Sequence, residues 1–312
     1  MTSPVHETVT TRLNPAIDPA LHIWGWEITV YLFLGGLVAG LFILSALFEL
    51  QKAKPSTSSG MRSVPLLALV LLSLGMGTLF LDLEYKAHVY RFYLAFRPSS
   101  PMSWGAWILL LVYPVGLLLW LGNLPAALQL PVLARPMAVA QRWRRPLLWL
   151  SVAMGVGLGL YTGLLLGTLS ARIQWSSTVL GPLFLTSGIS TGAALLLLLP
   201  LHADERKTLI RWDLVAIATE LLLLALLLIG YASGSSAARM AGAVFMGGAW
   251  TASFWSLVVV VGLCVPLAMG LLEVRKHLPL IALTPVLVLI GGLSLRAILL
   301  ASGQETGFRL LP

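Results

Sequence analysis

Residues 24–40 read WGWEITVYLFLGGLVAG, and this stretch decides the fold class of the chain. After Glu27 it holds no charged residue, and the apolar run continues to Leu47. A helix needs about 20 such residues to cross the hydrocarbon core of a bilayer. The stretch therefore predicts a first transmembrane span, with an acid and a phenol, Glu27 and Tyr31, one helical turn apart near its mouth.

The composition extends this prediction to the whole chain. Of its 312 residues, 58% are hydrophobic and 10% are charged, and the mean hydropathy is +0.91. These values exclude an ordinary soluble domain and predict an all-α polytopic membrane protein. The single cysteine, Cys264, excludes a disulfide framework and a cysteine-ligated iron–sulfur cluster on this chain. The net charge of +8 is spread over short loops, which indicates membrane topology rather than nucleic-acid binding.

About eight apolar runs are long enough to span a membrane. We expect one integral membrane domain over residues 1–312: an N-terminal segment 1–22 without a cleavable signal peptide, spans within 23–300, and a tail 301–312. The spans are expected to form two four-helix bundles. They are predicted at Trp26–Leu47, Val64–Leu83, Gly105–Leu121, Leu147–Leu169, Pro182–Leu199, Leu214–Tyr231, Ala252–Leu272 and Pro279–Leu300.

The distribution of basic residues predicts the orientation. Most of the 20 Lys and Arg residues lie in loops that follow the first, third, fifth and seventh spans. Cytoplasmic loops carry an excess of Lys and Arg, so both termini and the loop 84–103 are expected on the outer face.

Five polar side chains are predicted to share one layer in the outer leaflet. At 1.5 Å per residue, Tyr31, Tyr161 and Arg296 lie about 5–9 Å to the outer side of the midplane, and Glu27 and Asp82 about 12–14 Å. Two acids, two phenols and a fixed cation suit a pocket for an amphipathic headgroup. In the alternative interpretation the acids end helices in the wet interface, Arg296 snorkels outward or pairs with Asp82, and the tyrosines belong to the aromatic belt.

Glu220 lies near the middle of the sixth predicted span, slightly to the inner side. An acid at this depth is either a proton-relay group or is neutralised by a neighbouring helix, and the sequence favours neither.

The histidines exclude a membrane haem b, which needs axial histidines within the helices. All of them lie in loops or at helix ends, at His6, His22, His88, His202 and His277. We therefore expect neither haem nor metal on this chain, and any electrons must come from the cofactors of a partner.

Four blocks of sequence, in order along nearly the whole chain, resemble the NrfD-like family of membrane subunits, also called the polysulfide reductase type. The first is WGWEITVYLFLGGLVAG. The second joins Asp82-Leu-Glu, Tyr90-Arg-Phe-Tyr and Arg97-Pro-Ser-Ser-Pro-Met-Ser-Trp-Gly-Ala-Trp. The third is Gly159-Leu-Tyr-Thr-Gly, and the fourth joins Gly291-Gly-Leu-Ser-Leu-Arg and Ala301-Ser-Gly-Gln. One departure is Tyr85-Lys-Ala-His-Val, where the family commonly has a proline and a basic residue.

The resemblance implies eight or more transmembrane helices in a bacterial cytoplasmic membrane. It implies electron exchange between menaquinone or ubiquinone and a ferredoxin-like [4Fe–4S] subunit, which serves a catalytic subunit that is often a molybdopterin enzyme. The family's quinone residues correspond here to Glu27, Tyr31, Asp82 and Tyr161, all of which belong to the predicted polar layer.

The leading hypothesis is therefore a quinone-reactive redox subunit. Glu27 or Asp82 would accept protons, and Tyr31 or Tyr161 would hold a quinone carbonyl. The loop 90–107 is rich in aromatic and Arg residues, a composition typical of interfaces, and we expect the iron–sulfur partner to dock there on Arg91, Arg97 and Trp104.

The alternative hypothesis is a secondary transporter without redox chemistry. Transporters place their sites near the midplane, between repeats with broken helices. Here the two halves of the chain show no convincing repeat, and the polar layer is off-centre.

Overall fold

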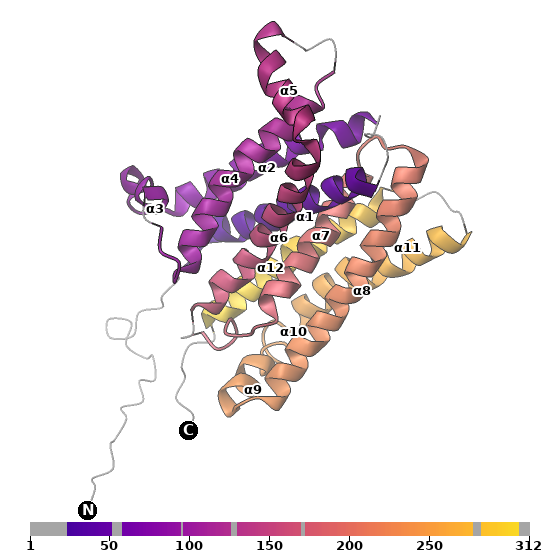
Figure 1. Cartoon of the computed structure of the whole chain (residues 1–312). Helices are drawn as coiled ribbons and strands as arrows, with labels where there is room; N and C mark the ends of the chain where they lie inside the picture. The colour runs from indigo at the N-terminus through magenta and orange to yellow at the C-terminus, as the bar shows by residue number, and fades with distance from the viewer. Residues whose placement is uncertain are drawn as a thin grey trace, which may run out of the picture.

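The computed structural model describes residues 24–51, 58–94, 96–125, 130–169, 172–276 and 282–305. In these ranges the chain is helical and contains no strand (Figure 1). Among the described residues, eight helices are long and apolar enough to cross a membrane, which confirms the predicted class. Helices suit a lipid environment because every backbone polar group in lipid must form its hydrogen bond within the chain. Seven of these spans are single helices: α1 (Trp26–Gln51), α2 (Ser59–Asp82), α4 (Pro101–Gly122), α6 (Arg144–Gly167), α7 (Leu180–Leu197), α8 (Ala203–Ser233) and α12 (Leu283–Glu305). The span before α12 runs through three consecutive elements: α10 (Thr251–Ser253), the π-helix η4 (Phe254–Cys264) and α11 (Val265–Lys276).

Several helices extend beyond the predicted spans because polar turns continue them. The clearest case is α8, which begins at Ala203 rather than Leu214. Its first turn is closed by a capping box in which the backbone N–H of His202 donates to Glu205 (3.2 Å). Hydropathy alone detects the apolar part of such a helix and not its polar beginning.

The connections also hold short helices that the apolar pattern did not predict. They are η1 (Lys86–His88), α3 (Arg91–Leu94), η3 (Pro131–Leu133), α5 (Ala134–Arg142) and α9 (Ser236–Ala243). Figure 1 shows α3 and α5 projecting from the bundle of long helices.

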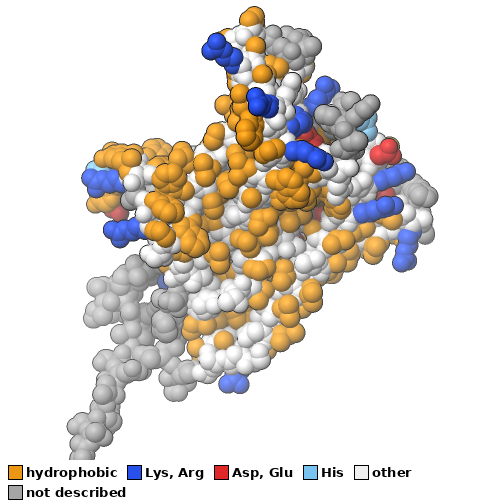
Figure 2. All heavy atoms as spheres, viewed as in Figure 1, with side chains coloured by type: hydrophobic (Ala, Val, Ile, Leu, Met, Phe, Trp, Pro, Cys, Tyr) orange, Lys and Arg blue, Asp and Glu red, His pale blue; other side chains and the backbone are white. Residues whose placement is uncertain are grey.

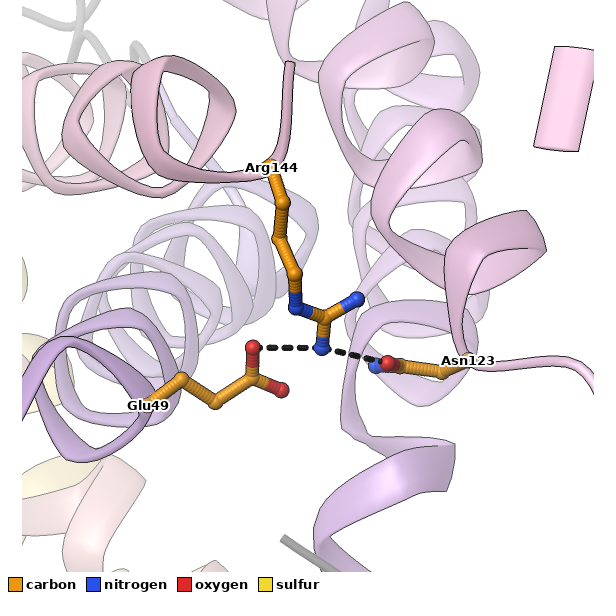
Figure 3. A network of polar contacts seen from close by, with 3 residues as sticks. All are labelled: Glu49, Asn123 and Arg144. Carbon is orange, nitrogen blue, oxygen red and sulfur yellow. Dashed lines mark hydrogen bonds and ion pairs between the residues drawn. The ribbon is translucent and has the colours of Figure 1, made fainter. Parts of the chain in front are cut away.

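A polar network fixes the base of the α5 connection (Figure 3). Arg144, at the start of α6, donates from Nη2 to Glu49 on α1 and to Asn123 after α4, both at 2.6 Å. The guanidinium therefore joins three helix ends at one point.

Glycines let the central helices approach closely. A Cβ on Gly188 of α7 would overlap the backbone of Gly36 of α1, and one on Gly192 would overlap Gly40. In lipid, where apolar side chains gain little by leaving the solvent, such small-residue contacts drive helix association. Gly36 and Gly40 therefore serve close helix packing, with α1 and α7 in the middle of the molecule.

The exterior matches a lipid environment. Figure 2 shows hydrophobic side chains over the flanks of the long helices, with Lys and Arg near their ends and on α5. Apolar side chains such as Leu74, Trp149 and Val215 are well exposed, as expected for helices that are surrounded by lipid rather than by water.

The chain enters and leaves the bundle at the same end. Trp24, just before α1, hydrogen-bonds to Gln304 near the end of α12. We refer to this end as the outer end, following the predicted orientation. The orientation itself and the division into two four-helix bundles stay predictions, and residues 1–22 and 306–312 lie outside the described ranges.

Candidate functional site

A cavity of about 580 Å³ opens at the outer end, between α1, α2, α4 and α6. A volume of this size, with apolar walls and a few polar groups, is typical of a small-molecule site. The lining residues are Trp24, Ile28, Tyr31, Leu32, Met76, Gly77, Leu79, Phe80, Asp82, Leu83, Val89, Tyr93, Met102, Ala106, Leu109, Tyr161, Leu165 and Leu166.

Two phenols from different helices meet in this cavity. Tyr31 of α1 and Tyr161 of α6 are 2% and 7% exposed, so neither is a belt residue. Their hydroxyl groups lie close enough to interact but not in hydrogen-bond geometry, and Tyr31 Oη has no hydrogen-bond partner among the described residues. A buried hydroxyl without a partner costs about 1–3 kcal/mol, which a ligand oxygen in the cavity would recover.

The position of Tyr161 depends on a glycine of α4. A Cβ on Gly105 would overlap the Tyr161 ring at Cζ, Cε1 and Cε2. The ring occupies the space that the missing side chain leaves, so Gly105 sets where the phenol lies.

The two acids lie at the cavity mouth. Asp82 ends α2, is exposed and lines the cavity, whereas Glu27 is half-buried in the first turn of α1 and is not a lining residue. The carboxylates lie near enough to repel each other, and Lys86 of η1 partly offsets the charge on Asp82. Asp82 is therefore accessible both to water and to the cavity that holds the phenols.

Two further lining residues, Trp24 and Tyr93, were not predicted as part of the site. Trp24 lies just before α1, outside the spans from which the polar layer was predicted. Tyr93 belongs to α3, whose formation the loop sequence did not indicate. Burial raises the pKa of the Tyr93 phenol, and Tyr113 adds to the rise, so Tyr93 is a hydrogen-bond donor at neutral pH.

The structure places Arg296 in the core and not in the cavity. Its side chain is fully buried, neither snorkelling nor paired with Asp82. The guanidinium donates to the carbonyls of Leu32 (3.1 Å), Gly292 (2.9 Å) and Phe184 (3.3 Å) and to Ser187 Oγ (3.1 Å). The expected place beside the other polar groups was wrong because depth along α12 left the direction of the side chain undetermined.

Glu220 is buried in α8 and approaches Ser187, which is bonded to Arg296. Two helical turns away, the buried Asp213 accepts a hydrogen bond from Ser190 Oγ (2.8 Å). The charge of Arg296 on α12 also acts on Glu220, and both interpretations of Glu220 stay predictions.

Two of the three residues predicted for partner docking line a second hollow, of about 670 Å³. Arg91 and Arg97 line it, and it shares Leu83 and Met102 with the first cavity. Trp104, on the first turns of α4, is 46% exposed. The basic surface therefore adjoins the cavity.

Comparison with known proteins identifies the family. The family model described as "Polysulphide reductase, NrfD" matches residues 15–307. The chain belongs to the NrfD family. It is 30% identical over 299 residues to the C subunit of polysulfide reductase from Wolinella succinogenes, covering 90% of this chain and 94% of that protein. It is 30% identical over 305 residues to protein NrfD of Escherichia coli, covering 91% of this chain and 96% of that protein. A protein NrfD homolog of Haemophilus influenzae is 26% identical over 306 residues, with 91% and 95% covered.

The NrfD assignment makes this chain a multi-pass membrane subunit of a redox complex, and the family interacts with quinones. Within the described ranges, no three or more His, Cys, Asp or Glu side chains form a group able to hold a metal ion. The family, the eight candidate spans and the cavity at one end of the bundle are all consistent with such a membrane subunit.

Proposed function

We propose that the chain is the quinone-reactive subunit of a respiratory oxidoreductase in a bacterial cytoplasmic membrane. It passes electrons between the quinone pool, menaquinone or ubiquinone, and a ferredoxin-like [4Fe–4S] subunit that serves a molybdopterin or other catalytic subunit. The observation that carries this proposal is the apolar cavity holding the unpartnered Tyr31 hydroxyl.

The cavity fits a quinone headgroup better than a polar metabolite. A quinone is a flat apolar ring with two carbonyl oxygens and a long apolar tail, so it needs apolar walls and one or two donors. Tyr31 and Tyr161 supply donors at the buried end, and exposed apolar side chains such as Phe80 and Met102 lie where a tail would leave. An ion or sugar would lose its hydration against these walls without recovering it.

Glu27 and Asp82 handle the protons. Oxidation of a bound quinol supplies two electrons and two protons, so a proton acceptor must stand beside the hydroxyl donors. Asp82 lines the cavity and takes a proton from its interior, and Glu27, close to Asp82 at the mouth, passes the proton to water. A protonated Asp82 also relieves the repulsion between the two carboxylates.

The electrons leave through the outer end. The docking surface consists of Arg91, Arg97 and Trp104, next to the shared residues Leu83 and Met102. A partner seated here would bring its nearest cluster close to the headgroup, and aromatic and Arg side chains are favoured in such interfaces.

Glu220 is the proposed proton relay toward the inner side. Asp213, Glu220 and Arg296 form a buried polar series with Ser190 and Ser187 between them. Arg296 also bonds the carbonyl of Leu32, a cavity residue, so the series ends at the cavity wall. Buried acids in membranes commonly mark proton relays.

The transporter alternative finds less support. Its site would be expected near the midplane, whereas the cavity opens at one end of the bundle and the chain belongs to a family of redox-complex subunits.

Infrared difference spectroscopy tests the binding mode directly. The full chain in lipid nanodiscs would be loaded with menadione carrying ¹³C at one carbonyl. Tyr31→Phe should move that carbonyl stretch to higher wavenumber, because a hydrogen bond weakens the C=O bond. Tyr113→Phe is the matched control, since the Tyr113 hydroxyl contacts Ser73 (3.1 Å) and is not part of the cavity. Identical carbonyl bands in wild type and Tyr31→Phe would contradict the proposed contact.

A further inference from the structure

Trp24 is fixed by contacts that a simple interface anchor does not need. It precedes α1, so its backbone belongs to no helix. The side-chain amide of Gln304 satisfies that backbone on both sides: Trp24 N–H donates to Gln304 Oε1 (2.9 Å), and Gln304 Nε2 donates to Trp24 O (3.0 Å). Two bonds to one amide fix the residue's direction as well as its place.

The clamp on Trp24 is itself held. Arg172 Nη1 donates to the carbonyl of Gln304 (2.6 Å), and the Gln304 side chain is 7% exposed. The end of α12 and the connection before α7 are therefore joined at the residue that holds Trp24. Gln304 is a rigid support rather than a mobile surface side chain.

A second indole fixes the Trp24 ring. The rings of Trp24 and Trp175 stack with centroids 5.4 Å apart and planes inclined by 24°. Trp175 is fully buried, and its Nε1 donates to the carbonyl of Leu299 (2.8 Å). Its ring fills the space beside Gly303, where a Cβ would overlap it. Trp175 therefore cannot tilt, and the ring stacked on it is held nearly parallel to a fixed plane.

Trp24 differs from Trp26, its neighbour in the sequence, in what its ring faces. Trp26 is 62% exposed on the outside of the bundle, as a lipid anchor should be. Trp24 lines the cavity instead, and Trp175 covers one of its faces. What Trp24 presents to the cavity is therefore its remaining aromatic surface, in the same cavity as Tyr31.

We propose that Trp24 is a stacking platform for the ring of the ligand, and that Gln304 and Trp175 are positioning residues for it. This inference rests on the proposed quinone site and adds a residue that binds by aromatic contact rather than by hydrogen bonding. The ring of a quinone lies against the indole while its carbonyl oxygens reach the phenols.

The test measures menadione binding to the full chain in lipid nanodiscs by equilibrium dialysis. Trp24→Leu should weaken binding about threefold to tenfold, the range of an aromatic pair, whereas Trp24→Phe should retain most of the affinity. Gln304→Met, which keeps an unbranched side chain but removes both amide bonds, should weaken binding in the same direction. Trp26→Leu is the matched control and should bind as wild type does.

A second measurement needs no variant. Oxidative footprinting of the wild-type chain, read by mass spectrometry, should show that saturating menadione protects Trp24 and leaves Trp26 unprotected. Protection together with recovery by Phe supports the platform, because a residue that only stacks on Trp175 would gain no shielding from the ligand. Equal affinity of wild type and Trp24→Leu, or no protection of Trp24, would overturn the platform alone. Failure of wild type to bind menadione would overturn the proposed quinone site itself.

Discussion

Gly105→Ala tests the geometry of the cavity with a single added methyl group. The new Cβ would overlap three atoms of the Tyr161 ring, far inside the 3.5–4.0 Å that carbon atoms prefer. Overpacking of this kind costs about 1–3 kcal/mol. Because Tyr161 is packed among cavity residues, the ring must shift by about 1 Å or more, and a shift of this size in a reacting group can lower a rate about a hundredfold.

The assay is quinol-dependent turnover of the purified complex, with thermal stability measured in parallel. Gly105→Ala should lower turnover by about tenfold to a hundredfold. Gly230→Ala is the matched control, since a Cβ there meets nothing within 4 Å and Gly230 does not line the cavity. It should keep turnover and gain up to about 1 kcal/mol of helix propensity. Wild-type turnover in Gly105→Ala would refute the claim that the placement of Tyr161 matters.

Three further predictions concern other parts of the chain. Gly188→Ala places a methyl group against the backbone of α1 and should destabilise the chain by about 1–3 kcal/mol in thermal unfolding in detergent. Gly230→Ala, where a Cβ meets nothing within 4 Å, should not destabilise it. Equal stability of the two variants would contradict the close packing of α1 and α7. The double change Arg91→Glu and Arg97→Glu should release the proposed iron–sulfur partner during purification while the membrane subunit stays inserted. Unchanged co-purification would count against this docking surface. Glu220→Gln should reduce proton translocation in proteoliposomes more than electron transfer, and equal loss of both, or of neither, would indicate a structural role.

The spans could be predicted from the sequence because a bilayer imposes one length and one composition on every crossing helix. The short helices could not, because α3 and α5 carry no long apolar run and are held by neighbours such as α4. The same distinction explains why α8 starts well before its apolar run, at Ala203.

Only part of the site could be predicted from the sequence. Depth along a span follows from residue number, so Tyr31, Tyr161 and Asp82 were expected in one layer, and the structure brings them into one cavity. Direction around the helix does not follow from residue number. Arg296 therefore lies in the core, although its depth alone suggested a place beside the other polar groups. Trp24, for which no depth was derived, lines the cavity.

The most direct test of the central claim is the rate at which menadiol reduces the iron–sulfur clusters of the purified complex. Tyr161→Phe removes one hydroxyl with little change in volume, and Glu27→Gln removes one ionisable group. Each should lower this rate by roughly a hundredfold, the range of a lost general acid–base group, while turnover with an artificial donor that bypasses the membrane subunit stays normal. Tyr113→Phe should leave both rates unchanged. Wild-type menadiol rates in Tyr161→Phe and Glu27→Gln would show that the quinone reacts somewhere other than in this cavity.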